Sequence, residues 1–152
     1  MGSDLKKQII IPKEKAVFWM DRNGTWHNEH GPFEHPRIIK YFNSSIRKDE
    51  NGYYVHQSTD EFDEKVYFQY EDTALFVIGI MFDEKIYLKL NNGSESVLNP
   101  LNLFSKDDSL YIKEDGDLIK FTSNAMLKIA KYLTEENGKL YFCLNGEKWP
   151  VE

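Results

Sequence analysis

The hydrophobic and polar positions of this chain follow the same order twice, once near each end. Each copy starts with an apolar strand segment, passes through an acidic turn that ends at glycine, and continues with a second strand, an amphipathic helix and a third strand. The first copy covers residues 17–57 and the second covers residues 110–144. Because a repeat constrains the architecture before single residues are interpreted, this order predicts a duplicated β-β-α-β motif.

The two copies match in residue type and in spacing at several positions. The turn Asp21–Gly24 corresponds to Lys113–Gly116. Further matches are Trp19 with Tyr111, Trp26 with Leu118, Asn51-Gly52 with Asn137-Gly138, and the helical positions Ile39, Phe42 and Ile46 with Met126, Ile129 and Leu133. Apolar residues at three- and four-residue spacing predict one amphipathic helix in each copy, which packs its apolar stripe on a sheet.

The first copy has five extra residues between its second strand and its helix, in the stretch His27–Pro32. An insertion between two regular elements is usually a surface loop, and surface loops often carry function. We therefore expect this segment to form the functional surface of the protein.

The segment between the two copies has the pattern of strands and tight turns. Val66–Tyr70 alternates, Leu75–Phe82 is a continuous apolar run, and Ile86–Leu90 alternates before an Asn-Gly turn. We therefore predict an α+β fold in which a central antiparallel β-meander joins two similar β-β-α-β motifs, with the helices packed on the sheet. The prediction is one compact domain over residues 1–152, with flexibility over residues 1–15.

Composition and charge narrow the classes of partner. The net charge of −6 argues against nucleic-acid binding. The longest apolar run is too short for a membrane-spanning helix, so no membrane partner is expected. The single cysteine, Cys143, cannot form an internal disulfide, and no hydrophobic signal segment stands at the N-terminus. These features predict a cytoplasmic protein and leave its oligomeric state open.

Three of the four histidines, His27, His30 and His35, lie close together in and beside the extra segment. Imidazole groups are good ligands for zinc and iron, but this spacing matches no zinc motif. Three interpretations stay open: a metal site, a hydrogen-bonding loop beside a binding cleft, and ordinary surface residues. The sequence has no nucleophile elbow, phosphate-binding loop or dinucleotide fingerprint, so no catalytic residue and no cofactor are predicted.

Three stretches resemble one known family. They are Asp21-x-x-Gly24-x-Trp26-His27 with the loop at Gly31-Pro32, the helix over Ile39–Ile46 and the turn Asp49-x-x-Gly52-x-Tyr54; Tyr70–Phe76 with its Glu-Asp pair; and Leu144–Pro150. Together they are similar to an uncharacterised bacterial family, domain of unknown function 1285. The sequence departs from the family pattern at Ser58–Asp60, where Thr-Pro is usual, and at Ala74–Phe76, where Ala-Pro-Phe is usual. The resemblance implies repeated α+β motifs and a role in signalling or regulation, and it does not imply an enzyme.

The leading functional prediction is a non-catalytic binding or regulatory module whose ligand is a small molecule or a protein. Its expected ligand-binding residues are Trp26, His27, Phe33 and Asp72, because aromatic groups with a few polar groups are typical of ligand clefts. One alternative is a metal-dependent hydrolase that uses His27, His30 and His35. A second alternative is a structural or oligomerisation domain that pairs through the edge strand expected at Ser94–Leu98.

Overall fold

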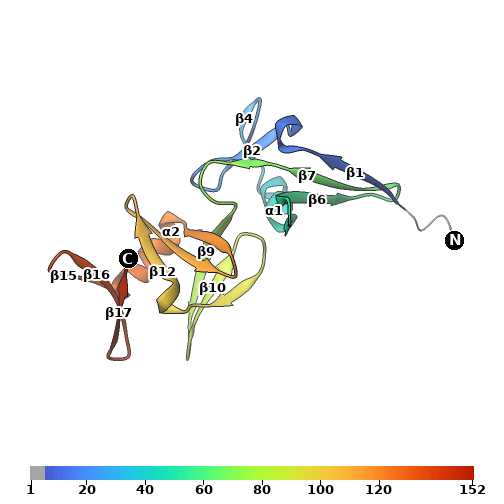
Figure 1. Cartoon of the computed structure of the whole chain (residues 1–152). Helices are drawn as coiled ribbons and strands as arrows, with labels where there is room; N and C mark the ends of the chain where they lie inside the picture. Colours follow the sequence, from blue (N-terminus) through green and yellow to red (C-terminus); the bar gives the residue numbers. More distant parts are fainter. Residues whose placement is uncertain (1–5) are drawn as a thin grey trace. The chain divides into compact units, whose positions relative to one another are not determined.

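The computed structural model describes residues 6–152, and they divide into two compact units (Figure 1). Unit 1 ends at Ala74 and unit 2 runs from Leu75 to Glu152. The flexibility predicted for residues 1–15 falls partly on residues 1–5, which lie outside the described residues. Within the rest of that stretch, Lys7–Ile11 forms strand β1 and Lys13–Lys15 forms a short 3₁₀ helix.

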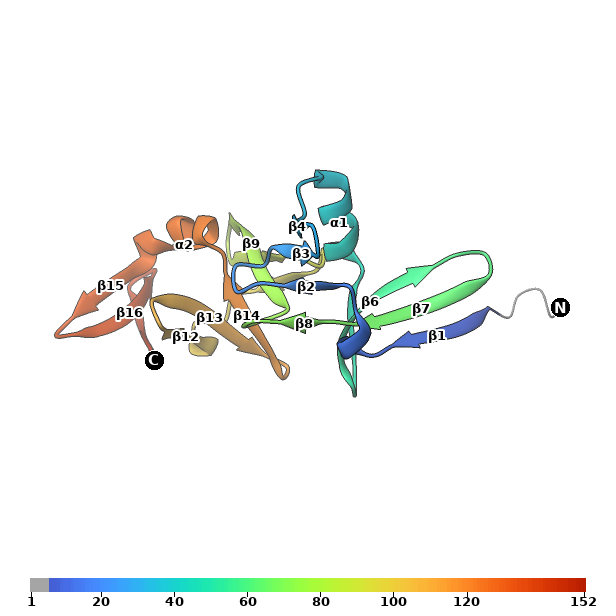
Figure 2. The same ribbon diagram turned by 90° about the horizontal axis from the view of Figure 1, so that it is seen from above.

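Unit 1 contains, over its described residues 6–74, two four-stranded sheets and one α-helix. The strand orders are β1-β7-β6-β5 and β4-β3-β2-β8, and Figure 2 shows β1 running beside the long β6–β7 hairpin. Strand β1 pairs in parallel with β7, and β2 pairs in parallel with β8. The bounds are β1 (Lys7–Ile11), β2 (Phe18–Met20), β3 (Trp26–Asn28), β4 (Gly31–Pro32), α1 (Pro36–Ser44), β5 (Ile46–Asp49), β6 (Gly52–Ser58), β7 (Phe62–Tyr67) and β8 (Gln69–Tyr70).

Unit 2 contains a six-stranded sheet of order β11-β10-β9-β14-β13-β12 and a three-stranded sheet of order β15-β16-β17. The only parallel pair in the six-stranded sheet is that of β14 with β9. The bounds are β9 (Leu75–Phe82), β10 (Ile86–Leu90), β11 (Glu95–Val97), β12 (Leu103–Lys106), β13 (Ser109–Glu114), β14 (Asp117–Phe121), α2 (Ser123–Ile129), β15 (Leu133–Glu136), β16 (Lys139–Leu144) and β17 (Glu147–Val151), with 3₁₀ turns at Pro100–Asn102 and Ala130–Tyr132.

The predicted α+β fold, with helices packed on one continuous sheet and built from β-β-α-β motifs, is wrong. Strands account for 53% of the structure and helices for 17%, and the strands form four separate sheets. The meander predicted between the copies does not join them, because β9 and β10 belong to the six-stranded sheet of unit 2. Residues 6–152 are therefore mostly β, with two short α-helices.

Both helices end one turn earlier than their apolar spacing predicts. Ile46 and Leu133 continue the helical stripes in the sequence, yet each begins a strand in the structure. Ile46 lies opposite Val55, and Leu133 lies opposite Phe142, so each residue gains a buried cross-strand partner. Among residues 6–152, neither α-helix has the length and apolar content that a membrane-spanning helix needs.

The core of unit 1 is an aromatic cluster around Trp26, whose side chain is 1% exposed. The rings of Phe18, Phe42 and Phe68 contact it edge-on, with centroids 4.8–5.7 Å away. The indole N–H donates a 2.7 Å hydrogen bond to Asn43 Oδ1 on α1. Strand β3 and helix α1 are therefore held together by both apolar contact and a satisfied polar group.

The antiparallel meanders β5–β6–β7 and β15–β16–β17 each contain a side-chain network of the same kind, made of a lysine, an acidic residue and a tyrosine. In the first, Lys65 Nζ lies 3.0 Å from Asp49 Oδ2 and above the ring of Tyr54. In the second, Lys148 pairs with Glu136 and lies above the ring of Tyr141. The strand registers show that the two sets correspond. Lys65 and Lys148 each lie opposite the residue that follows a buried centre, Val55 in the first meander and Phe142 in the second.

Candidate functional site

The segment between β3 and α1 differs in length from the corresponding connection of unit 2. In unit 1, residues 29–35 separate the second hairpin strand from the helix and include strand β4. In unit 2, only Thr122 separates β14 from α2, and its hydroxyl oxygen accepts a hydrogen bond from the N–H of Ala125. A single capping residue is enough to start a helix after a strand, so the longer connection of unit 1 is not required by the helix itself.

This longer connection forms one side of an open groove of about 650 Å³. Four apolar residues line it: Pro32, Phe33, Pro36 and Ile38. Four polar residues also line it: Asn28, His30, Glu34 and His35. A concave surface that combines apolar side chains with a few polar groups is what ligand sites present.

The groove is held in place by contacts to the core of unit 1. The N–H of Phe33 donates a 2.8 Å hydrogen bond to the carbonyl oxygen of Trp26 on β3. The ring of Phe33 meets that of Phe42 on α1 edge-on, with centroids 5.0 Å apart. The side chain of Asn28 accepts a hydrogen bond from the N–H of His30. The groove is therefore fixed to β3 on one side and to α1 on the other.

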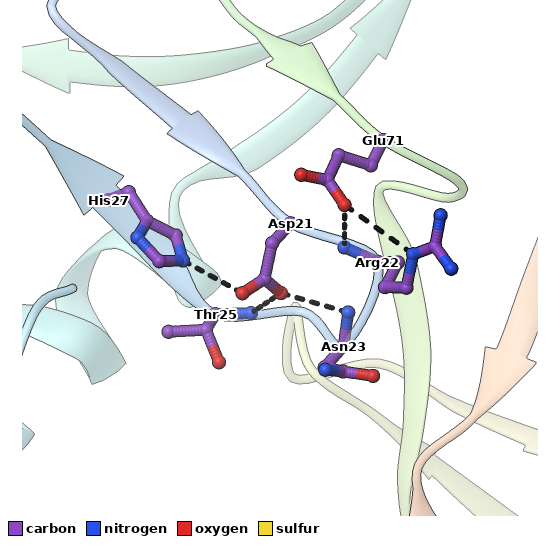
Figure 3. Close-up of polar contacts among 6 residues, drawn as sticks. All are labelled: Asp21, Arg22, Asn23, Thr25, His27 and Glu71. Carbon is purple, nitrogen blue, oxygen red and sulfur yellow. Dashed lines mark hydrogen bonds and ion pairs between the residues drawn. The ribbon is translucent and has the colours of Figure 1, made fainter. Parts of the chain in front are cut away.

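A second polar cluster closes the turn between β2 and β3 (Figure 3). The carboxylate of Asp21 accepts hydrogen bonds from the backbone N–H groups of Asn23 and Thr25 and from His27 Nε2, at 2.7–3.0 Å. Glu71, after β8, accepts a hydrogen bond from the N–H of Arg22. Gly24, at φ 82°, supplies the left-handed residue that this turn requires.

The environment of Asp21 lowers its pKa. Burial by itself raises the pKa of Asp21. The hydrogen bonds from His27 and from the Thr25 and Asn23 N–H groups together lower it by more, so the net pKa lies below the ordinary value. The carboxylate is therefore charged at neutral pH and fixes the ring of His27 through Nε2.

The sheet that carries this turn has an inner and an outer face. Trp26 and Met20 point into the core, while Trp19 and His27 lie opposite each other on the other face. The two rings stack, with centroids 5.7 Å apart and planes 9° apart. Trp19 is 40% exposed.

The residues predicted for ligand and metal binding fall in different places. Phe33, His30 and His35 line the groove, whereas His27 is held in the turn by Asp21. Trp26 lies in the aromatic core, and Asp72 is half-buried after β8 and does not line the groove. Within residues 6–152, no three His, Cys, Asp or Glu side chains gather as a group that could hold a metal ion.

Comparison with known proteins gives a fold. No family model and no curated protein matches this sequence. A crystal structure of a DUF1285 family protein from Silicibacter pomeroyi DSS-3 matches with a TM-score of 0.64 and 15% identity, over 99% of this chain and 86% of that one. The chain has the fold of a DUF1285 family protein. A second DUF1285 structure, from Shewanella baltica OS155, matches with a TM-score of 0.54 and 17% identity, over 78% of this chain and 94% of that one.

The family resemblance predicted from the sequence is thus confirmed at the level of the fold, and the DUF1285 name leaves the function open. The sequence did not point to five of the groove residues: Asn28, Pro32, Glu34, Pro36 and Ile38. The extra segment itself was the available signal for Asn28 and Pro32, which lie in it. Ile38 stands beside the apolar stripe of the helix, and only the structure shows that it faces the groove.

Proposed function

We propose that this protein is a non-catalytic binding module of cytoplasmic regulation, and that its ligand binds in the groove between β4 and α1. The proposal rests on the groove: its eight lining residues all come from the segment 28–38, and most of this segment has no counterpart between β14 and α2. A connection that the helix does not require, and that forms a concave surface, is well explained by binding.

The chemistry of the groove supports a ligand that is partly apolar. Phe33 and Ile38 offer apolar surface from two different elements, the loop and the helix. The side chains of Glu34 and His35 have no hydrogen-bond partner among the residues that the structure describes. Polar groups that are not used by the fold remain available to orient a ligand.

The proposal can be tested with ligand-detected NMR on a library of small aromatic and carboxylate compounds. We expect several compounds to bind the wild-type protein and to lose their signal in Phe33→Ala. Leu127→Ala is the matched control, because Leu127 is also an apolar side chain next to a helix stripe and is 77% exposed in unit 2. If no compound binds, or if Phe33→Ala and Leu127→Ala retain the same binding, the groove is not the ligand site.

A further inference from the structure

Helix α1 exposes apolar and basic side chains next to the groove. Ile38 and Tyr41 are 47% and 49% exposed, although Ile39 and Phe42 on the same helix turn toward the sheet. Ile38 also lines the groove, so the exposed face of α1 and the groove form one continuous surface. We call this the α1 surface and define it by Phe33, Arg37, Ile38, Lys40 and Tyr41.

The α1 surface is locally basic in a chain whose net charge is −6. Helix α1 carries Arg37 and Lys40 and no acidic residue. Both cations are exposed, and neither has an ion-pair partner among residues 6–152. The nearest acidic residues in sequence are Glu34, which lines the groove, and Glu29, which lies 3.4 Å from His30. Arg37 and Lys40 therefore present positive charge beside apolar surface without an internal counter-ion.

The edge of the neighbouring sheet does not favour strand addition. Pro32 on the edge strand β4 has no N–H, and the N–H of Phe33 is already bonded to Trp26 on β3. A ligand at this edge gains few backbone hydrogen bonds, so side-chain contacts with the α1 surface must supply the recognition.

We propose that the α1 surface binds an acidic segment of a partner protein. Apolar side chains of that segment pack on Phe33, Ile38 and Tyr41, and its carboxylates pair with Arg37 and Lys40. This inference rests on the proposed function and specifies its ligand.

Two other occupants fit the charges less well. A second copy of this chain, docked face to face, brings the Arg37 and Lys40 side chains of both copies together, which is repulsive. A nucleic acid supplies negative charge, but it must approach a protein of net charge −6.

The test uses a short synthetic peptide in which Phe and Leu alternate with pairs of Glu, and a matched peptide with Lys at every Glu position. Binding is measured by fluorescence anisotropy at low and high salt. We expect the Glu peptide to bind the wild-type protein at least about tenfold more tightly than the Lys peptide, and to weaken as salt rises.

The double variant Arg37→Glu/Lys40→Glu should reverse this preference and bind the Lys peptide more tightly. The control is Lys128→Glu/Lys139→Glu, which makes the same charge change at exposed positions of unit 2 and should leave the preference unchanged. Reversal of the preference is a gain of binding, so a folding defect cannot produce it.

Three results overturn the inference. They are equal binding of both peptides, tighter binding of a single-stranded oligonucleotide than of the Glu peptide, and a dimer in sedimentation analysis that Arg37→Glu/Lys40→Glu abolishes. If small compounds still bind in a Phe33-dependent way while the peptides show no charge preference, the proposed function stands and only this inference fails.

Discussion

Unit 1 and unit 2 differ in their sheets, yet each has a hairpin before a short helix, and they connect that hairpin to the helix differently. Each has a hairpin, a short helix and a three-stranded antiparallel meander: β2–β3, α1 and β5–β6–β7 in one, and β13–β14, α2 and β15–β16–β17 in the other. Each meander also contains a lysine that pairs with an acidic residue and lies above a tyrosine ring. The difference lies in residues 29–35, and that is where the groove forms.

Unit 2 is the more regular of the two. Four of its hairpins, β12–β13, β13–β14, β15–β16 and β16–β17, close with two-residue turns at Asp107-Asp108, Asp115-Gly116, Asn137-Gly138 and Asn145-Gly146, and all eight residues have positive φ. Such turns match the twist of the flanking strands and connect them with the fewest residues. The β2–β3 hairpin of unit 1 instead has a longer turn that depends on the side chain of Asp21. The short turns of unit 2 show that such a hairpin folds without the longer turn found in unit 1.

The largest effect is expected from Trp26→Ala. Removal of this buried indole deletes the centre of the aromatic cluster and leaves Asn43 without its donor, so unit 1 should lose about 3–5 kcal/mol of stability. Amide hydrogen exchange is the measurement, with protection lost in β6 and retained in β16. Ile119→Ala, in the corresponding hairpin strand β14 and 3% exposed, should show the opposite pattern. Equal loss of protection in β6 and β16 in both variants would show that the two units do not unfold separately.

A smaller effect is expected from Asp21→Asn. This change removes the charge that binds His27, and it should cost about 1 kcal/mol at pH 7. Because the pKa of Asp21 is lowered on folding, its contribution is present above the unfolded pKa and is lost as the pH falls below about 4. The wild type and the variant should therefore converge in stability at acid pH in urea unfolding. Asp115→Asn is the control, because Asn also accepts the left-handed conformation of that turn; a pH-independent difference for Asp21→Asn would contradict the assignment.

The smallest effects are expected from the two meander networks, and they should be unequal. The hydrogen bond from Tyr67 and the one from Lys65 hold the pKa of Asp49 below its ordinary value. In unit 2, the position of Tyr67 is taken by Pro150, which has no hydroxyl, so Glu136 lacks this bond. Asp49→Asn should therefore lower the thermal midpoint more than Glu136→Gln, and added salt should weaken the Glu136–Lys148 pair more. Thermal unfolding by circular dichroism at two salt concentrations measures both, and the reverse order would show that the hydrogen bond from Tyr67 does not strengthen the Asp49 network.

Much of the local structure could be predicted from the sequence. The turns at Gly24 and Gly116 and the extra segment near His27–Pro32 follow from residue type and spacing alone. The helix ends could not be predicted, since Ile46 and Leu133 fit a helical stripe and a strand equally well. Only the distant strands β6 and β16 decide between them, and such tertiary pairing overrides a local pattern.

The site was harder to predict for a related reason. Phe18, Trp19 and Met20 are all apolar, so alternation alone does not say which face of the hairpin meets the core. The sequence therefore placed Trp26 at a ligand site, and the structure places it in the aromatic cluster with Phe42. The parallel pairing of β1 with β7 depends on residues far apart in the chain, and no local signal predicts it.

If the connection between β3 and α1, which unit 2 lacks, forms the binding surface, a ligand should perturb this region and leave unit 2 unchanged. The most direct test is an amide chemical-shift map, in which each compound or peptide that binds is added to isotope-labelled protein. The shifted amides should lie in residues 28–41, and residues 122–129, the corresponding region of unit 2, should not shift. Shifts centred in unit 2, or spread equally over both regions, would contradict this prediction.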